Sequence, residues 1–205
     1  MLVLGGGFAG LAFAKAFDTR LADVLLLDRE NHHLFQPLLY QVATAGLSAP
    51  DVAQPLRTIL RGKRGVEVQR QTATAIDLHE RVVTCGDTDF AYDYLVLGIG
   101  GKTLYFGNEH WAEHAPGLKS LNDAQRIRNT LLDSLEKAEA GVADDERQRL
   151  LTAVVVGGGA TGVEMAGTFA DLYYRAFPKD FRNIDTRTAR VVLIDAAPRD
   201  RKSVV

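Results

Sequence analysis

Short, wholly apolar runs recur along the chain, and two of them are followed by the same glycine pattern. Leu2–Leu4 and Ala153–Val156 are uninterrupted hydrophobic segments. Such runs are typical of strands in a parallel sheet that is covered on both faces. Each is followed by GxGxxG and then by a stretch rich in small and apolar residues, which predicts helices over 11–17 and 163–174. The pattern therefore predicts the same strand–turn–helix unit twice.

Each predicted unit continues into a second apolar strand that ends in an acidic residue. Val24–Leu27 is followed by Asp28, and Arg190–Ile194 is followed by Asp195. The first unit is compact, whereas the second contains the extra segment FPKDFRNIDTRTA, which we interpret as an insertion. Strand, helix and strand in this order predict a βαβ unit in each half.

The segment between the two units is richer in strand-like alternation. Ala53–Leu60 is predicted as a helix, and Tyr94–Leu97 as another buried strand. Ser120 with Asp123 three positions later resembles a capping box, and predicts the start of a long helix. A strand and a small antiparallel meander are predicted at 66–68, 73–77, 81–85 and 89–92. The fold class is thus α/β, with two Rossmann-like dinucleotide-binding units and a β-meander insertion.

The glycine pattern has a specific use at a strand-to-helix turn. The first glycine makes the turn, the second lets a phosphate approach the backbone, and the third lets helix and strand pack closely. The helix N-terminus then attracts the negative charge. One match is weak in a chain with 19 glycines, but two in the right context indicate dinucleotide binding. The two sets are Gly5, Gly7 and Gly10, and Gly157, Gly159 and Gly162.

The two strand-end acids extend this interpretation to the ribose. A carboxylate here accepts a hydrogen bond from the 2′-hydroxyl of an unphosphorylated ribose. At about 5 Å and an effective dielectric near 20 it would repel a 2′-phosphate by about 3 kcal/mol per unit charge. We therefore predict NADH rather than NADPH at the second site. A solvated strand end is the alternative for Asp28 and Asp195. Two dinucleotides on one chain suggest a flavin that accepts electrons from a nicotinamide.

Composition excludes several other classes. The net charge of −2 and a pI near 6.2 give no basic footprint for nucleic acid. The single cysteine, Cys85, rules out an internal disulfide framework, and it is expected to be a small buried residue. A flavin disulfide reductase needs a cysteine pair beside the flavin, and 31–60 has no cysteine. His32 and His33 are interpreted as packing or flavin-shell residues, and no metal site is expected.

The last six residues, Asp200–Val205, read DRKSVV. Back-translated as GAT CGG AAG AGC GTC GTG, they match a common short-read sequencing adapter. We expect this tail to be non-native and the chain to be an N-terminal fragment, truncated at the C-terminus. An ordinary charged tail is the alternative.

Longer motifs carry a resemblance to a family. The order GGGFAG, LLLDRENHHLFQPLLYQVATAGLS, AYDYLVLGIGG, FGNEHWAEHAPGLKSLNDA, VVVGGGATGVEMAG and DFRNIDTRTARVVLIDAAPR resembles type II NADH:quinone oxidoreductase, the single-subunit, non-proton-pumping NADH dehydrogenase. The resemblance implies a flavoprotein that passes hydride from NADH to FAD and electrons to a membrane quinone. It implies an FAD-binding domain over 1–107 and the first part of an NADH-binding domain over 108–199.

The resemblance also implies site residues. It places Asp28 on the FAD ribose with Arg29 beside it, and the Ala73 backbone at the adenine. Glu164, in the family's GVE, is the candidate catalytic residue near the nicotinamide and flavin; a helix-start carboxylate without a chemical role is the alternative. The FAD pyrophosphate residues would be Gly5, Gly6, Gly7, Phe8, Ala9 and Gly10. The isoalloxazine would lie near Thr44, Ala45 and Gly46, and Gly100 would be a further cofactor-binding residue. NADH would be bound by Gly157, Gly159, Gly162 and Asp195. Ile99 departs from the family's usual threonine.

Partners and location follow from the resemblance alone. It implies peripheral attachment to the cytoplasmic face of a bacterial-type membrane, through a C-terminal part absent here, and it leaves a homodimer open. An NADH-dependent ferredoxin or rubredoxin reductase is the closest alternative function, because it shares the double fold and lacks the cysteines. A nucleotide-sensing module without turnover is a further alternative.

Overall fold

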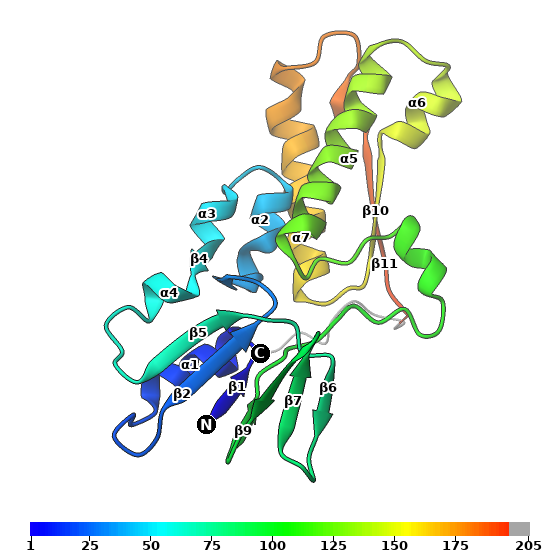
Figure 1. The fold of residues 1–205 in the computed structure, drawn as a ribbon. Coiled ribbons are helices and arrows are strands. Elements are labelled where there is room, and N and C mark those ends of the chain that lie inside the picture. The colour runs from blue at the N-terminus through cyan, green and yellow to red at the C-terminus, as the bar shows by residue number, and fades with distance from the viewer. Residues whose placement is uncertain (197–205) are drawn as a thin grey trace, which may run out of the picture. The chain divides into compact units, whose positions relative to one another are not determined.

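The computed structural model describes residues 1–196, and the predicted non-native tail at 200–205 lies outside this part (Figure 1). The chain divides into two compact units. The first contains Met1–Phe35 and Pro50–Lys102, and the second contains Gln36–Ala49 and the described residues from Thr103 onward. The assignment of an FAD-binding and an NADH-binding domain to the chain stays a prediction.

A four-stranded parallel sheet forms the centre of the first unit. Its order is β5 (Val66–Arg70), β2 (Val24–Asp28), β1 (Leu2–Leu4) and β9 (Leu95–Leu97). Strand β1 lies in the interior of the sheet and pairs in parallel with β2 and β9. The predicted strands at these four places are confirmed, and so is the parallel α/β class. The predicted burial of Tyr94–Leu97 is wrong, since Tyr94 and Leu97 are 68% and 57% exposed and β9 is an edge strand of this sheet.

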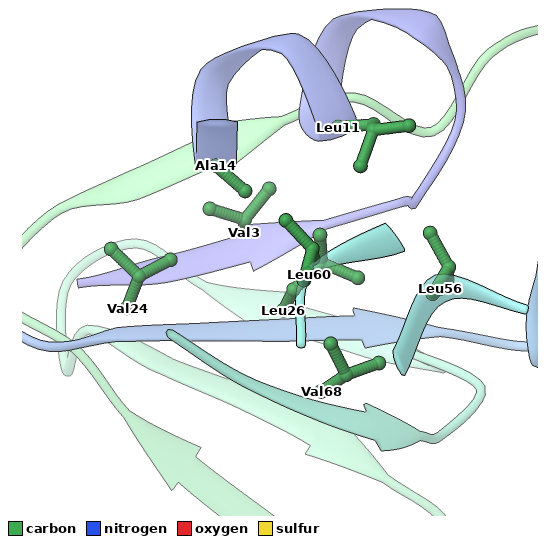
Figure 2. Packing of buried hydrophobic residues seen from close by; sticks show 8 residues of the cluster. All are labelled: Val3, Leu11, Ala14, Val24, Leu26, Leu56, Leu60 and Val68. Atoms are coloured by element: carbon green, nitrogen blue, oxygen red, sulfur yellow. The ribbon is translucent and has the colours of Figure 1, made fainter. Parts of the chain in front are cut away.

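Two different layers cover the faces of this sheet, which explains the continuous apolar runs. On one face, Val3 and Leu26 pack against Leu11 and Ala14 of helix α1 (Phe8–Ala16), with Leu56 close by (Figure 2). On the other face, Leu2, Leu4 and Leu27 pack against Val83 and Cys85. Because side chains alternate between faces along a strand, every residue of β1 is buried. Cys85 is only 4% exposed, as predicted.

The second covering layer is the predicted meander. It consists of β6 (Ala75–Asp77), β7 (Val82–Cys85) and β8 (Thr88–Ala91), in the antiparallel order β6-β7-β8. The meander prediction is confirmed, with strand ends shifted by one or two residues.

The predicted helix over 53–60 is wrong in its first half. Ala53–Pro55 forms β4, which pairs antiparallel with β3 (His32–Leu34). The helix α4 spans only Leu56–Ile59, after a separate turn of helix, α3 (Ala49–Val52). Pro55 has no N–H to donate, so it can end an edge strand but cannot lie within a helix. The pairing partner is about twenty residues away, so local propensity does not reveal it.

The second unit is built on two parallel strands, β10 (Thr152–Val156) and β11 (Arg190–Ile194). Helix α7 (Ala160–Asp171) packs on both strands, and α6 (Asp144–Leu150) packs on β10. The predictions of these two strands are confirmed. The prediction that the apolar run Ala153–Val156 is buried is wrong within the described residues. Val154 and Val156 are 53% and 67% exposed, because β10 pairs only with β11 in this part of the chain.

Long helix α5 (Leu121–Glu139) begins where the sequence predicts. The Ser120 side chain accepts the Asp123 N–H, and the Asp123 carboxylate accepts the Ser120 N–H, which completes the capping box. Helix α2 (Leu39–Ala43) packs on α5 and α7, so it belongs to this unit. The remaining short segments are η1 (Gln36–Leu38), η2 (Glu109–Glu113), the π-helical turn η3 (Leu172–Ala176), η4 (Phe177–Lys179) and η5 (Thr186–Thr188). No helix within 1–196 has the length and hydrophobicity that a membrane span requires.

Candidate dinucleotide-binding sites

The first glycine turn joins β1 to α1 in the first unit. Gly5 has φ of 97°, a left-handed conformation that favours glycine, and its N–H donates to the Leu27 carbonyl at 2.7 Å. Gly7 is the N-cap of α1, and its carbonyl accepts the Leu11 N–H at 3.0 Å. The turn is thus three residues long, and Gly10 lies inside the helix.

The second glycine turn repeats this arrangement in the second unit. Gly157 has φ of 108°, and its N–H donates to the Ile194 carbonyl at 2.7 Å. Gly159 is the N-cap of α7, and its carbonyl accepts the Val163 N–H at 3.0 Å. The two copies of the sequence motif therefore have the same turn, with the same two backbone hydrogen bonds.

The third glycine of each motif lies against the first. A Cβ atom on Gly10 would overlap the Gly5 carbonyl oxygen, and one on Gly162 would overlap the Gly157 carbonyl oxygen. By contrast, a Cβ on Gly159 would meet nothing within 4 Å. The third glycine permits close packing of helix and strand, and the second leaves the approach to the backbone open.

The N-termini of α1 and α7 are suited to an anion. Within these two helices, which are fully described, no side chain caps the N-terminus and no acidic residue lies in the first turn. The first N–H groups of a helix have no partner within the helix and carry a partial positive charge. These are the donors that hold phosphate at such turns.

A carboxylate at the end of the second strand contacts each turn. Asp28 Oδ2 accepts the Gly6 N–H at 2.5 Å, and its Oδ1 accepts the Glu30 N–H at 2.7 Å. Asp195 Oδ2 accepts the Gly158 N–H at 2.5 Å. The sequence predicted these acids as ribose contacts but missed their bond to the turn. The duplicated acid after the second strand was the available signal.

One pocket of the first unit lies beside Arg29, which is predicted next to the FAD ribose, and beside the segment of Ala73, which is predicted at the adenine. This pocket is about 410 Å³ and is lined by Arg29, Arg70, Gln71, Thr72, Thr74, Cys85 and Gly86. Ala73 is exposed and lies between two lining residues, and Arg70 Nε donates to the Arg29 carbonyl at 3.0 Å. The structure thus brings Arg29 and the Ala73 segment together.

The residues predicted near the isoalloxazine form the end of α2, in the second unit. The Gly46 N–H donates to the Gln41 carbonyl at 2.8 Å, and the Ala45 N–H donates to the Val42 carbonyl at 3.2 Å. These two bonds form a Schellman motif, with Ala45 in the left-handed region at φ of 61°. Thr44 is buried, and its hydroxyl donates to the Tyr40 carbonyl.

Gly98 and Gly100 follow β9 in the first unit. The Gly98 N–H donates to the Leu4 carbonyl at 2.7 Å, and a Cβ on Gly98 would lie 2.9 Å from the Gly10 nitrogen. The end of β9 therefore lies directly beside the first glycine turn. Gly100 has φ of 68°, while Ile99 is 71% exposed, and a cofactor contact at Gly100 stays a prediction.

Glu164 lies on α7 with an exposed side chain. The expectation that it lies in the first turn of this helix is wrong, because α7 begins at Ala160 and not at Val163. The last residues of a GxGxxG motif are already helical, so Glu164 occupies the second turn. Asp195, which accepts the Gly158 N–H next to the N-cap of α7, therefore has a more direct electrostatic relation to this helix N-terminus than Glu164 has.

Cys85 is unsuited to thiol chemistry in this structure. Burial, and to a smaller extent the charge of Asp89, raises the pKa of the Cys85 thiol. A raised pKa lowers the fraction of thiolate, which is the reactive form.

Comparison with known proteins places this arrangement in a family. The model of the pyridine nucleotide-disulphide oxidoreductase family matches residues 1–203. The chain belongs to this family. It is 45% identical, over 97% of its length and 44% of the relative, to a type II NADH:quinone oxidoreductase of Mycobacterium tuberculosis. It is 35% identical, over 97% of its length and 36% of the relative, to an external alternative NADH-ubiquinone oxidoreductase of Yarrowia lipolytica.

Solved structures of the family agree with the fold. NDH2 of Plasmodium falciparum in complex with NADH is 28% identical, with a TM-score of 0.87 over 94% of this chain and 40% of that one. The resemblance drawn from the sequence motifs is therefore confirmed. The chain spans less than half the length of the curated relatives it matches.

Proposed function

We propose that the chain is the dinucleotide-binding part of a flavoprotein oxidoreductase that passes hydride from NADH to FAD and electrons onward to a quinone. The observation that carries this proposal is the duplicated glycine turn, with the same backbone hydrogen bonds around Gly5 and Gly157. Two complete turns provide for two dinucleotides, as electron transfer between two cofactors requires. The similarity to type II NADH:quinone oxidoreductases over 97% of the chain supports the choice of donor and acceptor.

FAD fits the first unit. The turn at Gly5–Gly7 leads into a helix N-terminus without a competing acid, and Asp28 lies at the end of the adjacent strand. Arg29 and the residues on either side of Ala73 line a pocket of the same unit. When bound, FAD would supply a two-electron acceptor that can release electrons singly. The protein would hold its pyrophosphate at Gly5–Gly10 and its ribose at Asp28.

NADH fits the second unit. The open face of Gly159 and the α7 N-terminus would hold its pyrophosphate, and Asp195 would accept its ribose hydroxyl. We propose that Glu164 orients the nicotinamide or handles a proton beside it. The Schellman turn at Thr44–Gly46, which ends the helix packed on α7, is proposed to contact the isoalloxazine.

The remaining assignments are also proposals. We propose quinone as the acceptor and peripheral attachment to the cytoplasmic face of a membrane, through a segment outside these residues. A homodimer is compatible with this proposal. The names of the relatives, which include NADH-ubiquinone oxidoreductases, support the acceptor.

The test uses the complete gene product. Its flavin absorbance is bleached anaerobically with NADH, and reoxidation is followed after a soluble quinone is added. NADPH and ferredoxin serve as parallel controls. Fast bleaching by NADH and fast recovery with quinone are expected. Recovery only with ferredoxin would instead indicate the ferredoxin or rubredoxin reductase, and no bleaching would indicate a binding module without turnover.

A further inference from the structure

We propose that His33 is a positioning residue that fixes the orientation of the Gly6–Gly7 peptide in the first glycine turn. The ring nitrogen Nδ1 of His33 lies 3.0 Å from the Gly6 carbonyl oxygen. A carbonyl oxygen only accepts hydrogen bonds, so this nitrogen must carry the hydrogen. The inference rests on the proposed FAD site and deepens it, because it concerns how the chain prepares the phosphate-binding backbone.

The position of His33 in β3 directs its ring to the turn. Successive side chains of a strand point to opposite faces, so His32 and His33 are presented differently. His33 pairs with Gln54 across β4, whereas His32 pairs with Pro55 and has Nδ1 3.3 Å from Asn31 Oδ1. The two adjacent histidines therefore have different partners. Exposed His79, in the turn after β6 of the same unit, serves as the control.

Aromatic packing holds the His33 ring. Phe8, the first residue of α1, meets it edge to face, with ring centroids 5.1 Å apart and planes at 85°. Phe35 meets Phe8 in a similar way, at 5.5 Å and 67°. A ring held by such contacts keeps its donor in place without relying on a flexible side chain. Phe8, the first residue of α1, thus packs against the His33 ring that bonds to the glycine turn.

Because the Gly6–Gly7 peptide is trans, the hydrogen bond from His33 to the Gly6 carbonyl also fixes the direction of the Gly7 N–H. No cis peptide bond occurs in the described residues. In a trans peptide, the carbonyl oxygen and the following N–H point in opposite directions. When His33 holds the Gly6 carbonyl, the Gly7 N–H is turned away from His33 and fixed in direction. It is then available as a preset donor at the helix N-cap.

Asp28 fixes the preceding peptide in the same way. Its Oδ2 accepts the Gly6 N–H, so Gly6 is held on both sides by side chains from β2 and β3. Gly6 is buried, and a Cβ there would overlap the Leu56 side chain, so a larger residue would require Leu56 to shift. Glycine has wide backbone freedom. The hydrogen bonds from Asp28 and His33 restrict this freedom at Gly6, beside the backbone that is proposed to bind phosphate.

The test measures FAD affinity of the complete gene product after the flavin is removed. The dissociation constant is obtained from the change in flavin fluorescence for wild type, His33→Leu, His33→Asn and the control His79→Leu. The amide nitrogen of asparagine can take the place of Nδ1. Loss of one neutral hydrogen bond predicts roughly threefold to tenfold weaker binding in His33→Leu. His33→Asn should recover most of the affinity, and His79→Leu should match wild type.

A second measurement does not depend on any variant. Nitrogen NMR of the histidine-labelled wild-type protein at about pH 8, where an ordinary imidazole is neutral, reports which ring nitrogen carries the hydrogen. The expected signature is an Nδ1–H tautomer that is present in the wild-type spectrum and absent from the His33→Asn spectrum. A merely space-filling ring would not require this tautomer.

The outcomes separate this inference from the proposed function. Equal FAD affinity in His33→Leu and His79→Leu, or an Nε2–H tautomer at His33, would overturn the positioning role. A wild-type protein that binds no FAD would instead contradict the proposed function. If His33→Leu does not fold, His33→Asn and the wild-type tautomer still decide the matter.

Discussion

The backbone N–H of Gly158 donates to Oδ2 of Asp195 at 2.5 Å, and the Gly6 N–H donates to Asp28 in the same way. The strand-end acid of each unit is therefore part of the turn as well as a candidate ribose contact. Its negative charge is fixed beside the backbone that would receive the phosphates. The choice between NADH and NADPH should depend on this charge.

Asp195→Asn is expected to reduce the preference for NADH over NADPH. The wild-type carboxylate should disfavour a 2′-phosphate by about 3 kcal/mol at roughly 5 Å, which is about a hundredfold in kcat/KM. The asparagine oxygen can still accept the Gly158 N–H, so the turn should persist. Steady-state kinetics of the complete gene product with both nucleotides checks this, with exposed Asp180→Asn as the control. Equal use of NADPH by wild type would contradict it.

Gly162→Ala is expected to destabilise the second unit and weaken nucleotide binding. The new Cβ would overlap the Gly157 carbonyl oxygen, and such overpacking costs about 1–3 kcal/mol. Gly167→Ala, on the same helix, is the matched control, since a Cβ there meets nothing within 4 Å. That control should be neutral or stabilising by up to about 1 kcal/mol. Urea denaturation of both variants measures the difference, and equal midpoints would argue against the close approach.

Ala45→Gly is expected to stabilise the protein. Ala45 has φ of 61° at the end of α2, where a residue with Cβ is strained. Relief of this strain, less the greater flexibility of glycine in the unfolded chain, should contribute on the order of 0.5–1 kcal/mol. Denaturant unfolding of the full chain gives the value. A decrease in the free energy of unfolding would show that the backbone there is not strained.

Glu139→Gln is expected to lower the melting temperature near neutral pH. Desolvation raises the pKa of Glu139, but hydrogen bonds from the N–H groups of Arg182, Asn183 and Ile184, with the charge of Arg182, bring it below its usual value. A group whose folded pKa is lowered stabilises above its unfolded pKa and loses this contribution as pH falls through the folded pKa.

The Glu139→Gln difference should therefore shrink as the pH falls below about 4.5. Thermal denaturation across the acid range measures it, and exposed Glu136→Gln on the same helix is the control. A difference that is constant with pH would mean that the charge of Glu139 is not what holds the Arg182–Ile184 loop.

Glu164→Gln is expected to lower turnover while FAD stays bound. If this carboxylate handles a proton beside the nicotinamide, its loss should reduce kcat on the order of a hundredfold. The flavin spectrum of the purified variant shows whether the cofactor is retained, and Asp171→Asn at the end of the same helix is the control. Unchanged kinetics would assign Glu164 to the helix surface alone.

The sequence predicts best what depends on neighbouring residues. The apolar run of β1 predicts a buried strand. The strand is buried because α1 covers one face of it and the meander covers the other. The Ser120–Asp123 pair predicts the start of α5 because both partners of the capping box lie within one turn. The GxGxxG spacing likewise predicts where each helix begins, because the carbonyl of its second glycine accepts an N–H four residues later.

Features that depend on distant partners are not predictable in this way. Strand β4 exists because β3 lies beside it, and its own sequence, AQP, gives no strand signal. The bond from Asp28 to the turn depends on the register of β2 beside β1, and the His33 contact depends on where β3 begins. The exposure of Val156 likewise depends on strand neighbours and not on its own hydrophobicity.

The membership of Gln36–Ala49 in the second unit has a practical consequence for protein engineering. Residues before and after this segment belong to the first unit, so no single cut divides the chain into its two units. A fragment that begins at Thr103 would lack α2, which packs on α5 and α7. A fragment that ends at Lys102 would keep α2 without these two helices. An isolated second unit would need Gln36–Ala49 supplied as a separate peptide or joined by circular permutation.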